Sequence, residues 1–291
     1  MSMKRTIISL LALACSLIPS AGFAVPTQNL WEVAALGTQP AVTLVQLAGM
    51  NPVPTTTLEA LWPESAAYTP LAVAMSAPYC ASSDANDTSA GTGARTISVK
   101  GVDTSAVRFT ETVIMNGQTS VVLATANIAL IDSLEVLTAG SGGLNAGIIQ
   151  CGTGANTAGD PAVTHAYLGI GSISVALSDG QRSNMFFYGV PAGYSLLCKD
   201  WTISTSEATA ASPTQVVVDT YTNGGILKRY RIAFQEAGGG NPNTVTRRIV
   251  FPERTILIGQ VGGLSNNEPV LLTSDCLLIN NAYMLEPGGI L

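Results

Sequence analysis

Short runs of apolar and β-branched residues follow one another along most of the chain from residue 96 onward. Gly, Asn or Asp bounds the runs, and none of them keeps the helical period of about 3.6 residues. The runs span residues 96–99, 107–115, 120–131, 134–137, 166–170, 172–177, 185–190, 195–203, 215–221, 228–235, 255–261 and 270–279. This pattern predicts an all-β fold, a jelly-roll-like β-sandwich that occupies residues 89–291.

The dipeptide Asn116-Gly117 lies between two of these apolar runs, at 112–115 and 120–122. Asn-Gly accepts the positive φ angles of a type I′ turn, which joins paired and twisted strands. The sequence therefore predicts a tight hairpin centred on this dipeptide.

Prolines recur between residues 25 and 88, where the apolar pieces are short. Long helices are excluded in such a segment, so we expect a Pro-rich extended arm and linker that precede the sandwich. The polar stretch 81–95 is expected to be a loop. Three aromatic residues are predicted to anchor the arm, either on the main body or on a neighbouring subunit: Trp31, Trp62 and Tyr68.

The N-terminal segment 1–24 has the charged, apolar and small-residue order of a secretory signal peptide. Lys4 and Arg5 precede the apolar run 6–18, and Gly22 and Ala24 suit cleavage before Val25. One alternative is an uncleaved segment that packs against a partner or a membrane. Another is a lipoprotein signal that uses Cys15. The run is too short for a permanent membrane span.

Charge is scarce in this chain, since 11% of the residues are charged and 47% are hydrophobic. An ordinary soluble domain has roughly 25% charged residues, so we expect a weakly charged surface that copies of the chain bury against one another. The net charge of −6 and the scattered cations disfavour a nucleic-acid partner.

Four cysteines remain if the N-terminal segment is removed: Cys80, Cys151, Cys198 and Cys276. Their wide spacing excludes the usual zinc pairs. One or two disulfides can form in an oxidising compartment. The apolar runs around these cysteines favour free, buried thiols instead.

Catalytic groups are few. His165 is the single histidine, follows a turn, and is expected to be a surface residue. No serine lies in a Gly-x-Ser-x-Gly elbow. The carboxylate pairs Asp103 with Glu111 and Asp132 with Glu135 are explained by turns or solvent-facing positions. We therefore predict no catalytic residue, and the chain is not expected to be an enzyme.

Ligand-binding motifs are also lacking. Asp84, Asn86 and Asp87 resemble calcium ligands, but no closing carboxylate follows at the required spacing, so a capped turn is favoured. The glycine-rich stretches 91–93, 140–143 and 238–240 have no strand-loop-helix context for a nucleotide. No metal or cofactor is predicted.

Three stretches resemble a family of structural proteins from marine tailed bacteriophages. They are Asn86-Asp-Thr-Ser-Ala-Gly-Thr-Gly-Ala-Arg-Thr-Ile-Ser-Val-Lys-Gly-Val-Asp103, Glu111-Thr-Val-Ile-Met-Asn-Gly-Gln-Thr119, and Thr138-Ala-Gly-Ser-Gly-Gly-Leu-Asn-Ala-Gly-Ile149. The resemblance covers most of residues 60–200. It implies a virion protein of the head decoration, tail or neck accessory type, with no catalytic residues.

Two functional hypotheses follow. The first is a non-enzymatic structural component of a phage virion that contacts other capsid or tail proteins and itself forms a homo-oligomer, for which a trimer is one candidate. The alternative, which the N-terminal segment favours, is an exported bacterial surface or periplasmic β-sandwich binding module. A secreted hydrolase would need a carboxylate pair in a cleft, and no motif indicates one.

Overall fold

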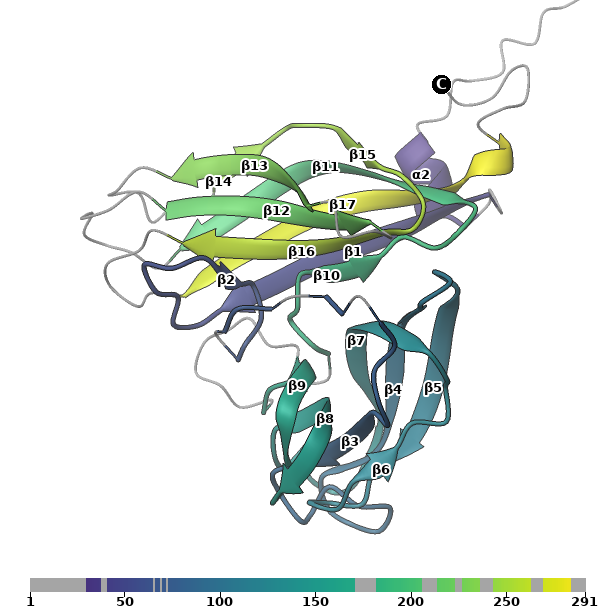
Figure 1. Ribbon diagram of the computed structural model, residues 1–291, viewed down its shortest axis with the longest axis vertical. Helices are drawn as coiled ribbons and strands as arrows, with labels where there is room; N and C mark the ends of the chain where they lie inside the picture. The colour runs from purple at the N-terminus through teal and green to yellow at the C-terminus, as the bar shows by residue number, and fades with distance from the viewer. Residues whose placement is uncertain are drawn as a thin grey trace, which may run out of the picture.

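The computed structural model describes residues 30–37, 41–64, 66–68, 70–71, 73–170, 182–205, 214–222, 227–235, 243–262 and 269–283. Within these ranges the fold is nearly all β (Figure 1). The short helix α2 (Leu30–Ala35) precedes the strands, and the 3-10 turn η2 (Asn281–Tyr283) follows them. The predicted signal segment 1–24 and the predicted strand 172–177 lie outside the described residues.

The first sheet is antiparallel and has the strand order β1-β17-β11, with β14 and β15 both paired to the far edge of β11. The bounds are β1 (Val42–Asn51), β11 (Tyr194–Thr205), β14 (Asn243–Val245), β15 (Ile249–Phe251) and β17 (Val270–Asn280). Residues of β17 alternate between buried and half-buried along most of the strand, because successive side chains point to opposite faces.

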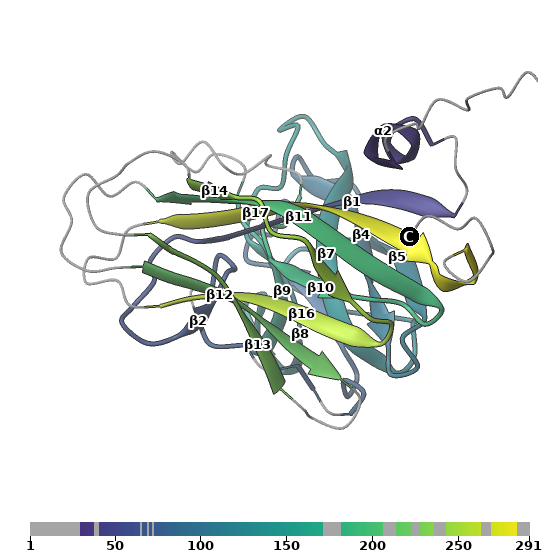
Figure 2. The same cartoon turned by 90° about the horizontal axis from the view of Figure 1, so that it is seen from above.

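The second sheet has the order β10-β16-β12-β13, and β2 also pairs with β16. The bounds are β2 (Glu59–Ala60), β10 (Phe187–Gly189), β12 (Thr214–Thr222), β13 (Leu227–Gln235) and β16 (Thr255–Gly262). The two sheets stack face to face (Figure 2). If β2 with β10, and β14 with β15, each count as one interrupted strand, the order is that of a jelly roll, so the predicted fold class is confirmed.

The strand formed by β2 and β10 is interrupted by a whole second domain. The chain runs beside β16 up to Leu61, enters the inserted domain, and lies beside β16 again from Phe186. The Phe186 amide donates to the Leu61 carbonyl at 2.9 Å. Gly259 of β16 bonds both segments, since its carbonyl accepts from Leu61 and its amide donates to Phe186. On the other side, a Cβ on Gly49 would lie 2.3 Å from the Phe186 nitrogen. Glycine at positions 49 and 259 therefore leaves space for the backbone at Leu61 and Phe186, where the chain enters and leaves the inserted domain.

The inserted domain contains two antiparallel sheets, ordered β6-β3-β8-β9 and β5-β4-β7. The bounds are β3 (Tyr79–Ser82), β4 (Ala94–Asp103), β5 (Arg108–Ile114), β6 (Val121–Val122), β7 (Ile128–Ala139), β8 (Ile149–Thr157) and β9 (Asp160–Leu168). It lies below the jelly roll in Figure 1, next to β10.

Each domain has its own apolar core, and the core of the inserted domain extends onto the jelly roll. Ile97 and Leu130 of the inserted domain share one buried cluster with Phe187 and Ile258 of the second sheet. The other faces of β10 and β16 fill the jelly-roll core around Trp201. The second sheet is thus covered on both faces along β10 and β16, which fixes the two domains against each other. Helix α2 covers a smaller cluster on the outer face of the first sheet.

One disulfide links neighbouring strands in each domain. Cys80 of β3 is bonded to Cys151 of β8 in the inserted domain, and Cys198 of β11 to Cys276 of β17 in the jelly roll. Each pair also stands directly opposite in strand register. The prediction of free thiols is therefore wrong. Residues far apart in the sequence become neighbours only once the strands have paired.

The predicted division into an arm (25–88) and one sandwich (89–291) differs from this arrangement. Most of the described part of the arm belongs to the two domains: β1 pairs with β17 along its whole length, β2 pairs with β16, and β3 lies in the inserted domain. The boundary at residue 89 falls inside the inserted domain, since proline spacing does not reveal which strands a segment joins.

The predicted hairpin at Asn116-Gly117 is also wrong. β5 pairs with β4 and β6 pairs with β3, so the dipeptide carries the chain from one sheet of the inserted domain to the other. Gly117 has a positive φ of 59°, but Asn116 does not, as a type I′ turn would require. Its conformation follows from tertiary contacts, because the Gly117 amide donates to the Asp87 carbonyl at 2.7 Å.

Candidate interaction site between the two domains

An ion pair within the inserted domain is hydrogen-bonded to strand β10 of the jelly roll. Arg108 of β5 donates two hydrogen bonds to Asp132 of β7, at 2.7 and 3.0 Å. Asp132 also accepts the amide of Gly189 in β10 at 3.1 Å. The Asp132 side chain is 2% exposed. Its hydrogen bond therefore holds β7 of the inserted domain to β10 of the jelly roll in a region where solvent screens charge little.

Tyr188 lies next to this ion pair, with its ring 4.9 Å from the guanidinium of Arg108. Burial lowers the pKa of Arg108, but the Asp132 carboxylate more than compensates and raises it above its ordinary value. Burial also raises the pKa of Tyr188 to about 12, the nearby arginine opposing the shift and Asp132 reinforcing it. Arg108 is thus a fixed cation and Tyr188 a neutral phenol, and neither titrates near neutrality.

A groove with a volume of about 560 Å³ runs beside this ion pair, between β1 and the inserted domain. Residues Thr43 to Ala48 of β1 form one wall. Polar and charged side chains form much of the other wall: Lys100, Arg108, Asp132, Ser133, Arg182, Ser183 and Asn184. The sequence did not indicate this site, because its walls come from strands and loops that are far apart in the chain.

A second cleft of about 360 Å³ lies where β10 and β16 meet the inserted domain, lined by Val102, Tyr221 and Thr255 among others. The Thr255 hydroxyl is buried and makes no hydrogen bond within the described part of the chain. Ala106 and Arg254, which also line the cleft, have positive φ angles of 59° and 61°. This cleft is smaller and less charged than the groove.

The predicted aromatic anchors contact the chain's own body. Trp62 packs edge-on against Tyr68, and both rings pack against Phe187 of β10. Trp62 and Tyr68 are buried, and burial raises the pKa of Tyr68. Trp31 is half-buried beside the first sheet, where the Lys199 ammonium lies 4.2 Å from its ring. A role for these residues in contacts with other subunits stays a prediction.

Asp87 is the second residue of the first stretch that resembles the phage family, and its structural carboxylate is fully buried. One of its oxygens accepts the amides of Ala94 and Ala146, at 2.6 and 2.8 Å. The other accepts the Gly147 amide at 2.9 Å and the Ser82 hydroxyl at 2.5 Å. Asp84 forms a local turn with Asn86. The structure therefore places these residues in capped turns, as the sequence favoured over a calcium loop.

Glycines in the same motif let the backbone approach Asp87. A Cβ on Gly93 would lie 2.1 Å from the Asp87 carboxylate, and one on Gly91 would lie 1.9 Å from the Asn86 carbonyl oxygen. A Cβ on Gly140 would lie 2.2 Å from the Gly91 carbonyl oxygen. The stretches that resemble the phage family thus form a compact group of turns around the Asp87 carboxylate, and these turns position β3, β4 and β8.

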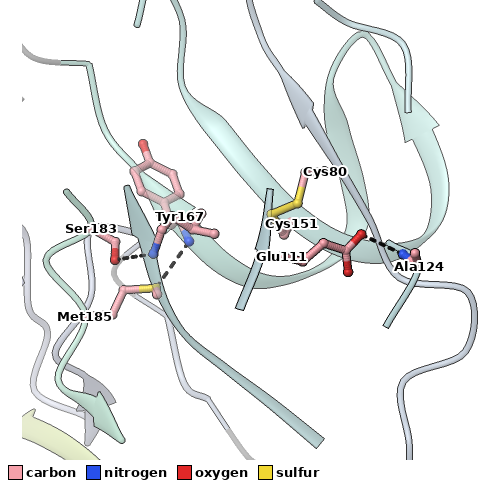
Figure 3. The surroundings of a disulfide bond; sticks show 8 residues. Cys80, Glu111, Ala124, Cys151, Tyr167, Ser183 and Met185 are labelled. Atoms are coloured by element: carbon pink, nitrogen blue, oxygen red, sulfur yellow. Dashed lines mark hydrogen bonds between the residues drawn. A yellow bond between two sulfur atoms is a disulfide. The ribbon is translucent and has the colours of Figure 1, made fainter. Parts of the chain in front are cut away.

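The carboxylate pairs considered for catalysis all have structural partners. Glu111 accepts the amide of Ala124, near the disulfide of the inserted domain (Figure 3). Although burial acts to raise the pKa of Glu111, this bond and those from Thr125 lower it overall. Glu135 pairs with Lys100 at 2.9 Å, and Asp103 accepts two nearby amides. Each carboxylate is used in local architecture.

His165 is buried in β9, so its expected surface position is wrong. Burial lowers the pKa of its imidazole, and its Nε2 lies 3.3 Å from the Thr153 hydroxyl. In the described part of the chain, no cluster of His, Cys, Asp or Glu is suited to a metal ion. No helix among the described residues is long and apolar enough to cross a membrane.

Comparison with known proteins yields similarity at the level of structure only. No family model matches the sequence, and no curated protein matches it. A structure of infectious bursal disease virus Gx strain is similar at a TM-score of 0.28 and 10% identity, covering 86% of this chain and 74% of the viral chain. A VP2 subviral particle of the same virus has a TM-score of 0.24 and 10% identity, with 90% and 80% covered. Likeness of this size carries no argument about function.

Proposed function

We propose that this protein is a non-enzymatic structural component of a bacteriophage virion, either a capsid decoration or a tail or neck accessory protein. The observation that carries the proposal is the construction of the phage-like motif around Asp87. The Asp87 carboxylate accepts four hydrogen bonds from within the fold, and the glycines of these stretches allow the backbone to pack closely around it. A motif of this kind maintains a shape.

The surface supports assembly with other copies or other virion proteins. The charged content is low for the chain length, and several large apolar side chains are more than half exposed. Three on the inserted domain are Val107, Ile114 and Val122, exposed by 57%, 60% and 63%. Single exposed apolar residues are common on any surface, but a weakly charged surface that carries many of them favours burial against neighbours.

Mass spectrometry of purified particles tests this proposal. We expect peptides of this chain in the particle fraction, in a fixed ratio to the major capsid protein and resistant to a salt wash. Particles that lack such peptides, although the chain is expressed in the infected cell, would overturn the proposal.

A second candidate is an exported surface or periplasmic binding module, and the two disulfides favour it. Disulfides persist in oxidising compartments and on cell or virion surfaces, and they are rare in the cytosol. Sequencing the mature N-terminus distinguishes the candidates. A chain that begins at Val25 and is recovered from the periplasm or cell surface of uninfected bacteria supports export. An intact Met1 in purified particles supports the virion role.

A further inference from the structure

We propose that the groove between β1 and the inserted domain binds an extended acidic segment of a partner polypeptide, which adds a strand to the free edge of β1. The proposal goes beyond the virion role and does not depend on it, because an exported binding module could use the same groove. Its basis is the combination of an unpaired strand edge and a cationic wall.

The edge of β1 that faces the groove presents a regular row of backbone groups. In an antiparallel strand, each residue directs its N–H and C=O groups to the same side, and successive residues alternate between the two sides of the strand. Ala41 bonds on the β17 side, since its carbonyl accepts from Asn280, whereas the Met50 amide donates away from β17 to Asn184. The register between β1 and β17 has no shift. Leu44, Gln46 and Ala48 therefore direct their backbone groups into the groove.

β17 is the only strand paired with β1 among the described elements, so this row is available to an added strand. An exposed edge of this kind is a template for pairing with another chain. The first sheet would continue across the groove, with the partner strand between β1 and the inserted domain. Leu44 is 43% exposed and offers an apolar contact to one face of such a strand.

The opposite wall determines the charge of the partner. Lys100 and Arg108 already have carboxylate partners, Glu135 and Asp132. Arg182 is exposed and has no ion pair within the described part of the chain. An acidic side chain on the added strand would pair with Arg182, whereas a basic one would be repelled by the positive charge that Arg182 leaves on this wall. The groove therefore selects an acidic segment although the whole chain has a net charge of −6.

A set of synthetic seven-residue peptides tests the proposal on the full chain. The peptides contain alternating Val and Thr, with one Glu placed at each position in turn, and matched sets carry Gln or Lys instead. We expect binding of the Glu peptides, measured by fluorescence anisotropy, at positions of one parity and at least tenfold tighter than the Lys peptides. Hydrogen exchange should slow at the amides of Leu44, Gln46 and Ala48.

Two variants separate the roles of the strand edge and the charge. Gln46→Pro removes an amide that points into the groove and should abolish binding while thermal unfolding stays near wild type. Arg182→Glu changes only an exposed side chain and should reverse the preference from Glu to Lys peptides. Lys228→Glu makes the same charge change on β13 and should leave binding unaltered.

No binding by any peptide, equal binding of Glu and Lys peptides, or full binding by Gln46→Pro would each overturn the proposal. The Arg182→Glu result decides the matter if Gln46→Pro does not fold. These outcomes are independent of whether the chain is found in virus particles, so failure here and failure of the virion role are distinguishable.

Discussion

Removal of the Asp87 carboxylate should destabilise the inserted domain more than any other change of a single polar side chain in its turns. The side chain is fully buried and accepts three backbone amides and one hydroxyl. A buried donor left without an acceptor costs roughly 1–3 kcal/mol. Asp87→Ala leaves three amides without their acceptor, so we expect a loss of about 4 kcal/mol or more, below simple additivity because water can enter the space.

Asp87→Asn keeps the shape and one oxygen, and so tests the hydrogen bonds alone. If the amide nitrogen takes the position of the second oxygen, the Ser82 hydroxyl can rotate and accept from it. The Gly147 amide cannot, and it would face another N–H group. The expected loss is roughly 2–4 kcal/mol. Asp84→Asn is the matched control, because Asp84 is less buried and its acceptor for Asn86 is retained, so its effect should stay under about 0.5 kcal/mol.

Urea unfolding followed by circular dichroism measures the free energy, and hydrogen exchange locates the damage. The Ala94, Ala146 and Gly147 amides should lose protection in Asp87→Asn, while β1 and β17 amides in the jelly roll should keep theirs. An unfolding free energy of Asp87→Asn within error of that of Asp84→Asn would contradict this prediction. So would a loss of protection spread evenly over both domains.

Three further predictions concern Gly49, a disulfide and the single histidine. Gly49→Ala should cost about 3 kcal/mol or more in urea unfolding, because its Cβ would overlap the Phe186 backbone at 2.3 Å, and Gly262→Ala, with a nearest contact of 3.2 Å, should cost clearly less. Replacing Cys80 and Cys151 by Ala should remove about 4 kcal/mol in the chain-entropy view, given their separation of 71 residues, and reductant should destabilise wild type by more than this, because it also opens the Cys198–Cys276 bond. Burial lowers the pKa of His165, so stability should be complete above the unfolded value of about 6.5 and fall as the pH drops below it; His165→Gln should flatten that slope.

Most of the jelly-roll strands could be predicted, because their side chains alternate between the core and the other face. The run 270–279 corresponds to β17, and 215–221 lies within β12. β8 (Ile149–Thr157) was missed since Gly152, Gly154 and several polar residues break the apolar pattern. Gly152 is required there, as a Cβ would lie 2.3 Å from the Val163 carbonyl oxygen. A strand whose neighbour crosses it closely loses the apolar signal that identifies strands.

β1 was missed for a different reason. Pro40 and Pro52 bracket the strand without interrupting it, so the proline spacing that indicated an arm in fact marks the two ends of a strand. Proline at a strand boundary removes no ladder hydrogen bond. The number of prolines alone therefore does not distinguish an arm from an edge strand. The positions of the prolines also matter, because prolines at the two ends of an apolar run leave a strand intact between them.

The insertion leaves no sequence signal because it interrupts a strand. β2 (Glu59–Ala60) is too short to predict, and although the predicted run 185–190 contains β10 (Phe187–Gly189), nothing in the sequence links β10 to β2, and neither completes the sheet alone. The halves meet at Leu61, Phe186 and Gly259, whose mutual hydrogen bonds require the inserted domain to bring its two ends together. Because the ends of that domain are held within one hydrogen bond, its orientation is set by the same sheet that stabilises the jelly roll. Binding of a partner in the groove along β1 would therefore order little of this protein itself, because the two walls of the groove are already packed against each other, and the entropy cost would fall on the extended segment.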